Sequence, residues 1–174
     1  MIVNIVLVIN TKKYPYHRNM SDIFSEAAGR YGTCQIFDLS VGTVLHMIYD
    51  EIEQSGCGLL ISLDLAGFEF RTETNTLSYN NLGCRMAHVL FRGMHEYREE
   101  LRQQMNFSMF LFSMREEDVA VMNDRYPNIP NVERIERMEY RHPAEEDMAK
   151  SRNIINKWFA HIMDEMELAV SPVV

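Results

Sequence analysis

Two carboxylates follow an apolar run of this sequence and are the clearest candidates for acid–base or ligand chemistry. The run from Gly58 to Leu63 ends at Asp64, and Glu69 lies in the polar segment that comes next. A carboxylate at the end of a buried strand stands at the rim of a sheet, where it can bind a ligand hydroxyl or act as a base. The structural alternative is that Asp64 caps the loop and Glu69 is solvated.

Two histidines extend this set. His17, followed by Arg18, lies just after the loop that leaves the first apolar run, which is a position suited to a base or to an anion-binding group. His88 lies within the apolar segment 86–91, where a core histidine bonded to a backbone carbonyl is the simpler interpretation.

The remaining candidates are polar residues near the predicted strand ends. Tyr79 and Asn80 precede a segment that we predict to be helical, so Asn80 is also a natural helix N-cap. We expect His17 and Asp64 to be catalytic, and we expect a crevice at the carboxyl ends of the strands to use the following side chains for ligand binding: Asn10, Glu69, Tyr79, Asn80, Arg85 and His88. No metal site is expected.

The elements that must position these residues alternate between apolar runs and amphipathic segments. The pattern predicts strands at 2–9, 33–39, 57–63 and 108–112, and a last, partly exposed strand at 132–138. It predicts helices at 19–30, from Val41 to the Ser55-Gly56 stop, at 82–91 and at 97–104. It also predicts a helix that the capping-box pattern at 113–116 opens and that runs to about residue 124, and a long closing helix at 143–168. Residues 1–174 are therefore expected to form a single α/β domain. Its architecture should be three-layered and Rossmann-like, with a mainly parallel sheet and a long C-terminal helix.

Composition excludes several classes of protein. The 174 residues are 47% hydrophobic and 24% charged, which is ordinary for a globular domain. The formal net charge of -8 argues against nucleic acid or an anionic membrane as the main partner. No apolar run approaches the roughly 20 residues that span a bilayer. Three widely spaced cysteines indicate reduced thiols and a cytoplasmic protein.

Common cofactor and catalytic motifs are missing. The loop after the first strand, residues 10–15, has no glycines, so a standard dinucleotide site is not expected. The sequence has no P-loop, no Cys-x-x-Cys pair, no His-Glu-x-x-His and no Gly-x-Ser-x-Gly elbow. We therefore expect no cofactor.

The order of the motifs resembles the amino-terminal half of bacterial GT-B glycosyltransferases, most closely the CgeB-like spore-maturation type. The resemblance covers most of residues 1–140. It rests on the first strand, the strand ending at Asp64, the Tyr79-Asn80…His88-x-x-Phe91 segment, and the later order Phe110-Leu111-Phe112-Ser113…Glu117-Asp118-Val119…Tyr126-Pro127.

In that family the amino-terminal half usually binds the acceptor, and a second half holds the nucleotide sugar. A chain of this length has room for one half. The resemblance therefore implies an acceptor-binding half-domain that acts with a glycosyltransferase partner subunit, or as part of a larger glycosyltransferase, on a sugar or protein acceptor.

Two other functions stay open. A non-enzymatic interaction module on the same fold would scatter the polar candidates and expose an apolar patch instead, and a homodimer would be compatible with it. A flavodoxin-like or response-regulator-like domain is less favoured. The first strand is not followed by an acidic pair, and its loop lacks a glycine-containing phosphate cradle.

Overall fold

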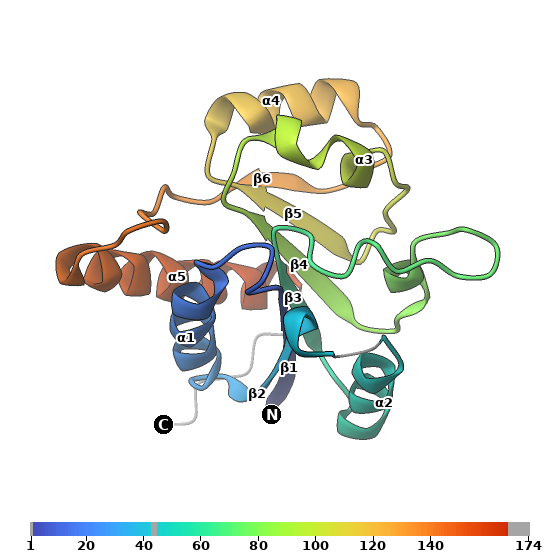
Figure 1. Ribbon diagram of the computed structural model, residues 1–174, viewed down its shortest axis with the longest axis horizontal. Coiled ribbons are helices and arrows are strands. Elements are labelled where there is room, and N and C mark those ends of the chain that lie inside the picture. Colours follow the sequence, from blue (N-terminus) through green and yellow to red (C-terminus); the bar gives the residue numbers. More distant parts are fainter. Residues whose placement is uncertain (1, 43–44, 167–174) are drawn as a thin grey trace.

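A six-stranded sheet with every neighbouring pair parallel forms the centre of the protein (Figure 1). The computed structural model describes residues 2–42 and 45–166. The strand order is β2-β1-β3-β4-β5-β6, which is a doubly wound order extended by one strand. The strands are β1 (Val3–Ile9), β2 (Gly32–Asp38), β3 (Leu59–Leu63), β4 (Arg85–Leu90), β5 (Met109–Ser113) and β6 (Val132–Arg134).

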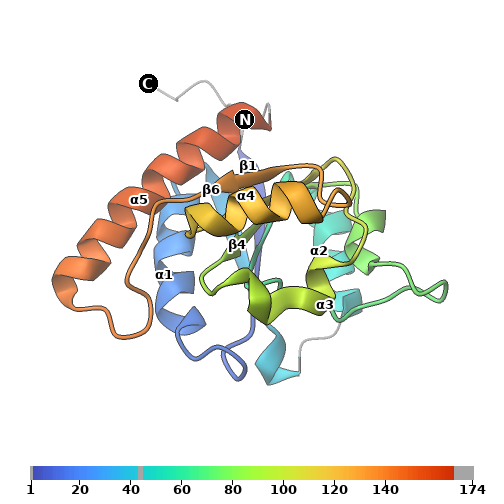
Figure 2. The same cartoon turned by 90° about the horizontal axis from the view of Figure 1, so that it is seen from above.

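Helices cover both faces of the sheet, which gives the predicted three layers (Figure 2). The α-helices are α1 (His17–Ala28), α2 (Leu45–Ser55), α3 (Arg98–Leu101), α4 (Glu116–Arg125) and the long α5 (Glu145–Glu165). The described residues also form the short 3-10 helices η1 (Leu39–Val41), η2 (Ser78–Asn81) and η3 (Met94–Tyr97). None of the helices in the described ranges is long and apolar enough to cross a bilayer.

Alternate side chains of β1 enter two different cores, which explains its continuous apolar sequence. Ile5 and Leu7 pack in the cluster that includes residues of α1 and α5. Val6 and Val8 pack in the cluster that includes residues of α2, α3 and α4. A strand buried on both faces has no polar side to show in its sequence.

The segment 82–91 was wrongly predicted to be helical; it contains β4, the strand between β3 and β5. Residues 86–90 are all buried. A short apolar run of this kind has no period that separates a buried strand from a buried helix, and pairing with two neighbours decides the outcome. The predicted helix at 97–104 is reduced to the short α3.

The other elements lie close to their predicted ranges. The last strand ends at Arg134, earlier than predicted, and the chain then runs as irregular backbone to α5. The predicted helix start near Val41 includes residues 43–44, and the predicted end of the closing helix includes residues 167–168. These residues lie outside the described ranges.

The strand order reverses direction between β1 and β3. The chain moves from β1 outward to β2, then returns to the other side of β1 for β3. The carboxyl ends of β1 and β3, at Ile9 and Leu63, therefore flank the switch point where open α/β sheets bind ligands.

Candidate functional site

Asp64 follows β3 directly and reverses the chain at the edge of the sheet. Asp64 and Leu65 both have positive φ angles, 50° and 58°. Non-glycine residues in this conformation each cost of order 1 kcal/mol or more, so the surrounding contacts must hold them there. Leu65 is buried and contributes to one of the two cores.

The Asp64 carboxylate accepts four hydrogen bonds. Oδ2 accepts from the Tyr16 hydroxyl at 2.6 Å and from His17 Nε2 at 2.8 Å. Oδ1 accepts from the Phe91 backbone N–H at 2.9 Å and from the Tyr97 hydroxyl. Tyr16 and His17 lie at the start of α1, Phe91 directly follows β4, and Tyr97 is the last residue of η3. The carboxylate after β3 therefore connects β3 to three other segments.

His17 lies between this carboxylate and the loop after β1. Its Nδ1 accepts a hydrogen bond from the Asn10 backbone N–H at 3.0 Å. The ring proton therefore sits on Nε2, where it is donated to Asp64. The pair is a neutral imidazole bonded to a carboxylate rather than an ion pair.

The whole group, which we call the Asp64 network (Asn10, Tyr16, His17, Asp64, Phe91 and Tyr97), is largely removed from solvent. The side chains of His17 and Asp64 are 0% exposed. Burial, and then the charge of Asp64, raises the pKa of the Tyr16 and Tyr97 hydroxyls far above the usual range, so both remain donors. A ligand cannot touch the Asp64 carboxylate without opening the structure.

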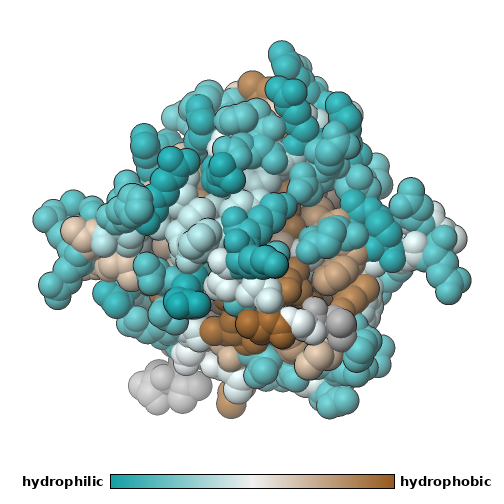
Figure 3. All heavy atoms as spheres, in the orientation of Figure 1, coloured by the Kyte–Doolittle hydropathy of each residue, from teal (hydrophilic) through white to brown (hydrophobic). Residues whose placement is uncertain are grey.

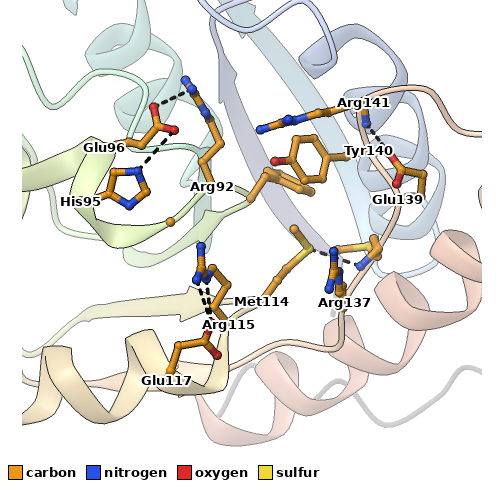
Figure 4. Close-up of a pocket in the computed structure, with 13 residues that line it drawn as sticks. Arg92, His95, Glu96, Met114, Arg115, Glu117, Arg137, Glu139, Tyr140 and Arg141 are labelled. Carbon is orange, nitrogen blue, oxygen red and sulfur yellow. Dashed lines mark hydrogen bonds and ion pairs between the residues drawn. The ribbon is translucent and has the colours of Figure 1, made fainter.

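A solvent-open cleft of about 530 Å³ lies beside this network (Figure 4). Three segments line it, and each follows the carboxyl end of a strand: one after β4, one after β5 and one after β6. The lining residues are Phe91, Arg92, Gly93, His95, Glu96, Met114, Arg115, Glu117, Arg137, Met138, Glu139, Tyr140 and Arg141.

The network and the cleft share a wall. The Phe91 N–H binds Asp64, and the Phe91 ring lies 5.4 Å from the Tyr140 ring. The Tyr16 ring lies 4.6 Å from Tyr140 and meets it edge-on. The Arg92 N–H donates to the Tyr97 oxygen at 3.2 Å. Asp64 therefore fixes the groups that support Tyr140 and the loop carrying Arg92.

Three of the sequence-predicted residues lie together at the switch point: Asn10, His17 and Asp64. Glu69 is exposed and accepts from the Gly67 N–H at 3.1 Å, within its own loop. Tyr79 is fully buried and donates to the Ala66 carbonyl at 3.0 Å.

Asn80 and Arg85 do not join this crevice, contrary to our expectation. Asn80 donates to the Gln104 carbonyl and accepts from the Asn106 N–H, near the start of β5, and Arg85 is the first residue of β4. The chain returns from the carboxyl edge at Asp64 to the amino edge before β4 begins. Residues just before a parallel strand therefore lie at the edge opposite the site.

His88 is a core residue on β4, bonded through Nδ1 to the Ser62 hydroxyl of β3 at 2.8 Å. Its ring meets Phe68 edge-on and stacks on Tyr79. Burial lowers the pKa of His88 to about 3, and its Nε2 has no hydrogen-bond partner among the described residues. The expected backbone carbonyl partner is thus replaced by a side-chain hydroxyl.

The residues that line the cleft were not among the predicted site residues. Arg92 and His95 were not predicted because the segment 82–91 was expected to be a helix. Without a strand there, the sequence showed no carboxyl strand end next to Arg92. Arg137 was hidden because the last strand was drawn through residue 138. The signal available was the Arg92-Gly93 pair, which directly follows a buried apolar run.

No group of three or more His, Cys, Asp or Glu side chains within residues 2–42 and 45–166 could hold a metal ion. The cysteines Cys34, Cys57 and Cys84 are free thiols.

Comparisons with known proteins identify the fold and leave the chemistry open. No family model matches the sequence, and no curated protein matches it. The structure is similar to the crystal structure of an esterase domain of a Rhodothermus marinus protein, with a TM-score of 0.54 and 10% sequence identity. The match covers 91% of this chain and 86% of that chain. It supports a parallel α/β fold, and nothing in the comparisons supports the glycosyltransferase resemblance at the level of sequence.

Proposed function

We propose that this protein binds a saccharide acceptor in the cleft after β4, β5 and β6, as an acceptor-binding half-domain that acts with a separate donor-binding partner. One observation carries the proposal: polar and charged side chains from three strand ends gather around one cleft beside the switch point. Its volume of about 530 Å³ suits a small ligand such as a mono- or disaccharide.

In this proposal His17 and Asp64 are positioning residues. They are buried, satisfied by hydrogen bonds and linked to the cleft through Phe91 and Tyr16. Groups that meet the acceptor come from the wall itself. Tyr140 points its hydroxyl into the cleft, and His95 lies on the opposite side (Figure 4).

Esterase activity is not proposed for this chain, although the similar solved structure is an esterase domain. An acyl-transfer enzyme of the serine type needs a hydroxyl activated by a base and open to substrate. In the described part of the chain, the Ser62–His88 pair has the required contact of 2.8 Å, but both residues are 0% exposed. We expect hydrolysis of p-nitrophenyl acetate to stay at the rate of the protein-free blank.

A protein-interaction module is the second candidate, because one region near the β2 edge exposes apolar side chains. Ile36 on β2, Val41 on η1 and Met47 on α2 are 38%, 77% and 46% exposed. Figure 3 shows an apolar area around η1 and α2, framed by hydrophilic residues. A concentration-dependent dimer in light scattering, lost in Val41→Glu, would favour this function.

Saturation-transfer NMR with a panel of saccharides tests the acceptor proposal. Glucose, N-acetylglucosamine, glucuronate and glucose 6-phosphate serve as the panel, with UDP-glucose and GDP-mannose as donor controls. At least one saccharide should bind and lose signal in Tyr140→Ala, whereas Tyr140→Phe keeps the ring that packs on Tyr16 and Phe91. Micromolar binding of either nucleotide sugar would refute the half-domain proposal.

A further inference from the structure

The cleft concentrates positive charge on a protein that is negative overall. Four arginines line it, Arg92, Arg115, Arg137 and Arg141, against three glutamates, whereas the whole chain carries a formal net charge of -8. Arginine is the side chain best suited to bind a planar carboxylate or a phosphoryl group through two parallel hydrogen bonds.

Two of the arginines are already paired with acids. Arg92 forms an ion pair with Glu96, four residues later. Arg115 directs Nε and Nη2 to Glu117 Oε1, at 3.0 Å and 2.8 Å. These pairs hold the guanidinium groups in place and leave them with further N–H donors.

The other two arginines of the cleft differ in this respect. Within the described ranges, Arg137 and Arg141 make no ion pair. The third glutamate of the cleft, Glu139, directs its Oε1 to the backbone N–H groups of Arg141 and His142 and not to either guanidinium group. Two guanidinium groups at one wall of the cleft therefore form no ion pair within the described ranges, although Arg137 is near enough to Glu117 to add to the effect of its hydrogen bonds, which lower the pKa of that carboxyl.

Arg141 is also partly preorganised. Its guanidinium carbon lies 5.6 Å from the centre of the Tyr140 ring. Figure 4 shows its side chain beside the Tyr140 hydroxyl, which points into the cleft. Packing on a fixed ring reduces the freedom that the guanidinium would lose on binding.

Gly93 leaves space for the opposite wall. A Cβ at Gly93 would lie 2.9 Å from Arg115 Nη1 and 2.8 Å from the His95 ring. The φ of Gly93 is -64°, which any residue can adopt, so the missing side chain matters for space and not for backbone conformation. Arg115 can therefore lie close to the β4 loop and complete the cationic lining.

From this arrangement we propose that the acceptor carries an oxyanion, a phosphoryl or carboxylate group, held by Arg137 and Arg141 with the Tyr140 hydroxyl and Arg115 beside them. This inference rests on the proposed acceptor site and names its substrate class: an anionic sugar. A neutral saccharide offers no negative charge to these two guanidinium groups.

Calorimetry with glucose 6-phosphate, glucuronate, inorganic phosphate and glucose tests this inference. At least one anionic sugar should bind more than tenfold tighter than glucose. Arg137→Gln and Arg141→Gln should each weaken that binding about tenfold, the effect of losing one charged hydrogen bond. The matched control is Arg30→Gln, which removes the same charge from an exposed residue at the opposite, amino edge of the sheet and should leave the affinity unchanged.

The comparison of the two anionic sugars identifies the oxyanion as phosphoryl or carboxylate, and either result supports the inference. Equal affinity for glucose and the anionic sugars, or an unchanged affinity in the double variant Arg137→Gln/Arg141→Gln, would overturn it and leave the acceptor function standing. Inorganic phosphate binding as tightly as glucose 6-phosphate would keep an anion site but remove the saccharide acceptor. Absence of binding by all four probes at millimolar concentration would overturn both proposals.

Discussion

Replacing Asp64 by asparagine tests the Asp64 network with an almost isosteric change. The carboxylate offers acceptor sites for four donors, and all four are present: the Tyr16 and Tyr97 hydroxyls, His17 Nε2 and the Phe91 N–H. An amide keeps one oxygen and places an NH₂ group where two of the donors converge. The fold should survive, because neither volume nor backbone conformation changes.

The loss in the free energy of unfolding depends on which of the four donors can find a new hydrogen-bond partner. If the amide oxygen stays at Phe91 and Tyr97, the Tyr16 hydroxyl can rotate and accept from the new NH₂. His17 cannot accept from this NH₂ group, because its ring proton would have to move from Nε2 to Nδ1. There it would face the Asn10 N–H, from which Nδ1 now accepts a hydrogen bond. One buried unsatisfied donor costs about 1–3 kcal/mol, and weaker bonds to a neutral acceptor add about 1 kcal/mol. We therefore expect Asp64→Asn to lower the free energy of unfolding by about 3 kcal/mol, which is about 9 °C in melting temperature.

Urea unfolding followed by circular dichroism measures this change. The control is Asp22→Asn on the exposed side of α1, which should change the free energy of unfolding by less than about 0.5 kcal/mol. A double-mutant cycle with His17→Gln should show coupling above about 1 kcal/mol, since the two residues share one hydrogen bond. A loss below about 1 kcal/mol for Asp64→Asn, or additive effects in the cycle, would show that the argument about donors is wrong.

Three further predictions concern the core and the thiols. Burial lowers the pKa of His88 to about 3 from 6.5, so below pH 6.5 the unfolded chain binds a proton that the native protein does not. The contribution of His88 to the free energy of unfolding should therefore fall by about 1.4 kcal/mol for each pH unit as the pH drops from 6.5 toward 3. Urea unfolding at pH 7 and pH 5 should show this component in the wild type and not in Ser62→Ala/His88→Phe. Trp158 packs on Phe24 and Phe112 with ring centroids 5.5 Å away, so Trp158→Ala should cost about 3–4 kcal/mol in the same assay, and an unchanged midpoint would mean that α5 is not docked. Thiol titration of the denatured, unreduced protein should find three free groups, and a count of one would contradict the expectation of no disulfide.

The positions of most elements could be predicted because their apolar patterns are long or strongly periodic. β1 is a continuous run of β-branched and aliphatic residues, and α5 repeats its buried residues at helical spacing, including Ile155, Trp158, Phe159 and Ile162. β4 was missed because residues 86–90 carry no period. Its identity as a strand depends on hydrogen bonds to β3 and β5, which are properties of the tertiary structure.

The site was predictable only in part, for a related reason. The contact between His17 and Asp64 follows from two parallel strand ends at the switch point, so position in the chain was enough to suggest it. The burial of both side chains was not visible, because it depends on Tyr16, Phe91 and Tyr97 arriving from three other segments. The cleft arginines could be found only after β4 and the true end of β6 were known.

The arrangement around Asp64 explains how a buried group can matter to an exposed site. Two consecutive residues with positive φ, Asp64 and Leu65, cost of order 1 kcal/mol or more each. The four hydrogen bonds that the buried Asp64 carboxylate accepts hold the chain in this conformation. The same bonds hold the Phe91 amide and the Tyr97 hydroxyl, which fixes the loop that carries Arg92 and Gly93. Loosening the network should therefore weaken binding of the proposed acceptor in the cleft as well as stability, even though the buried Asp64 carboxylate lies out of the acceptor's reach.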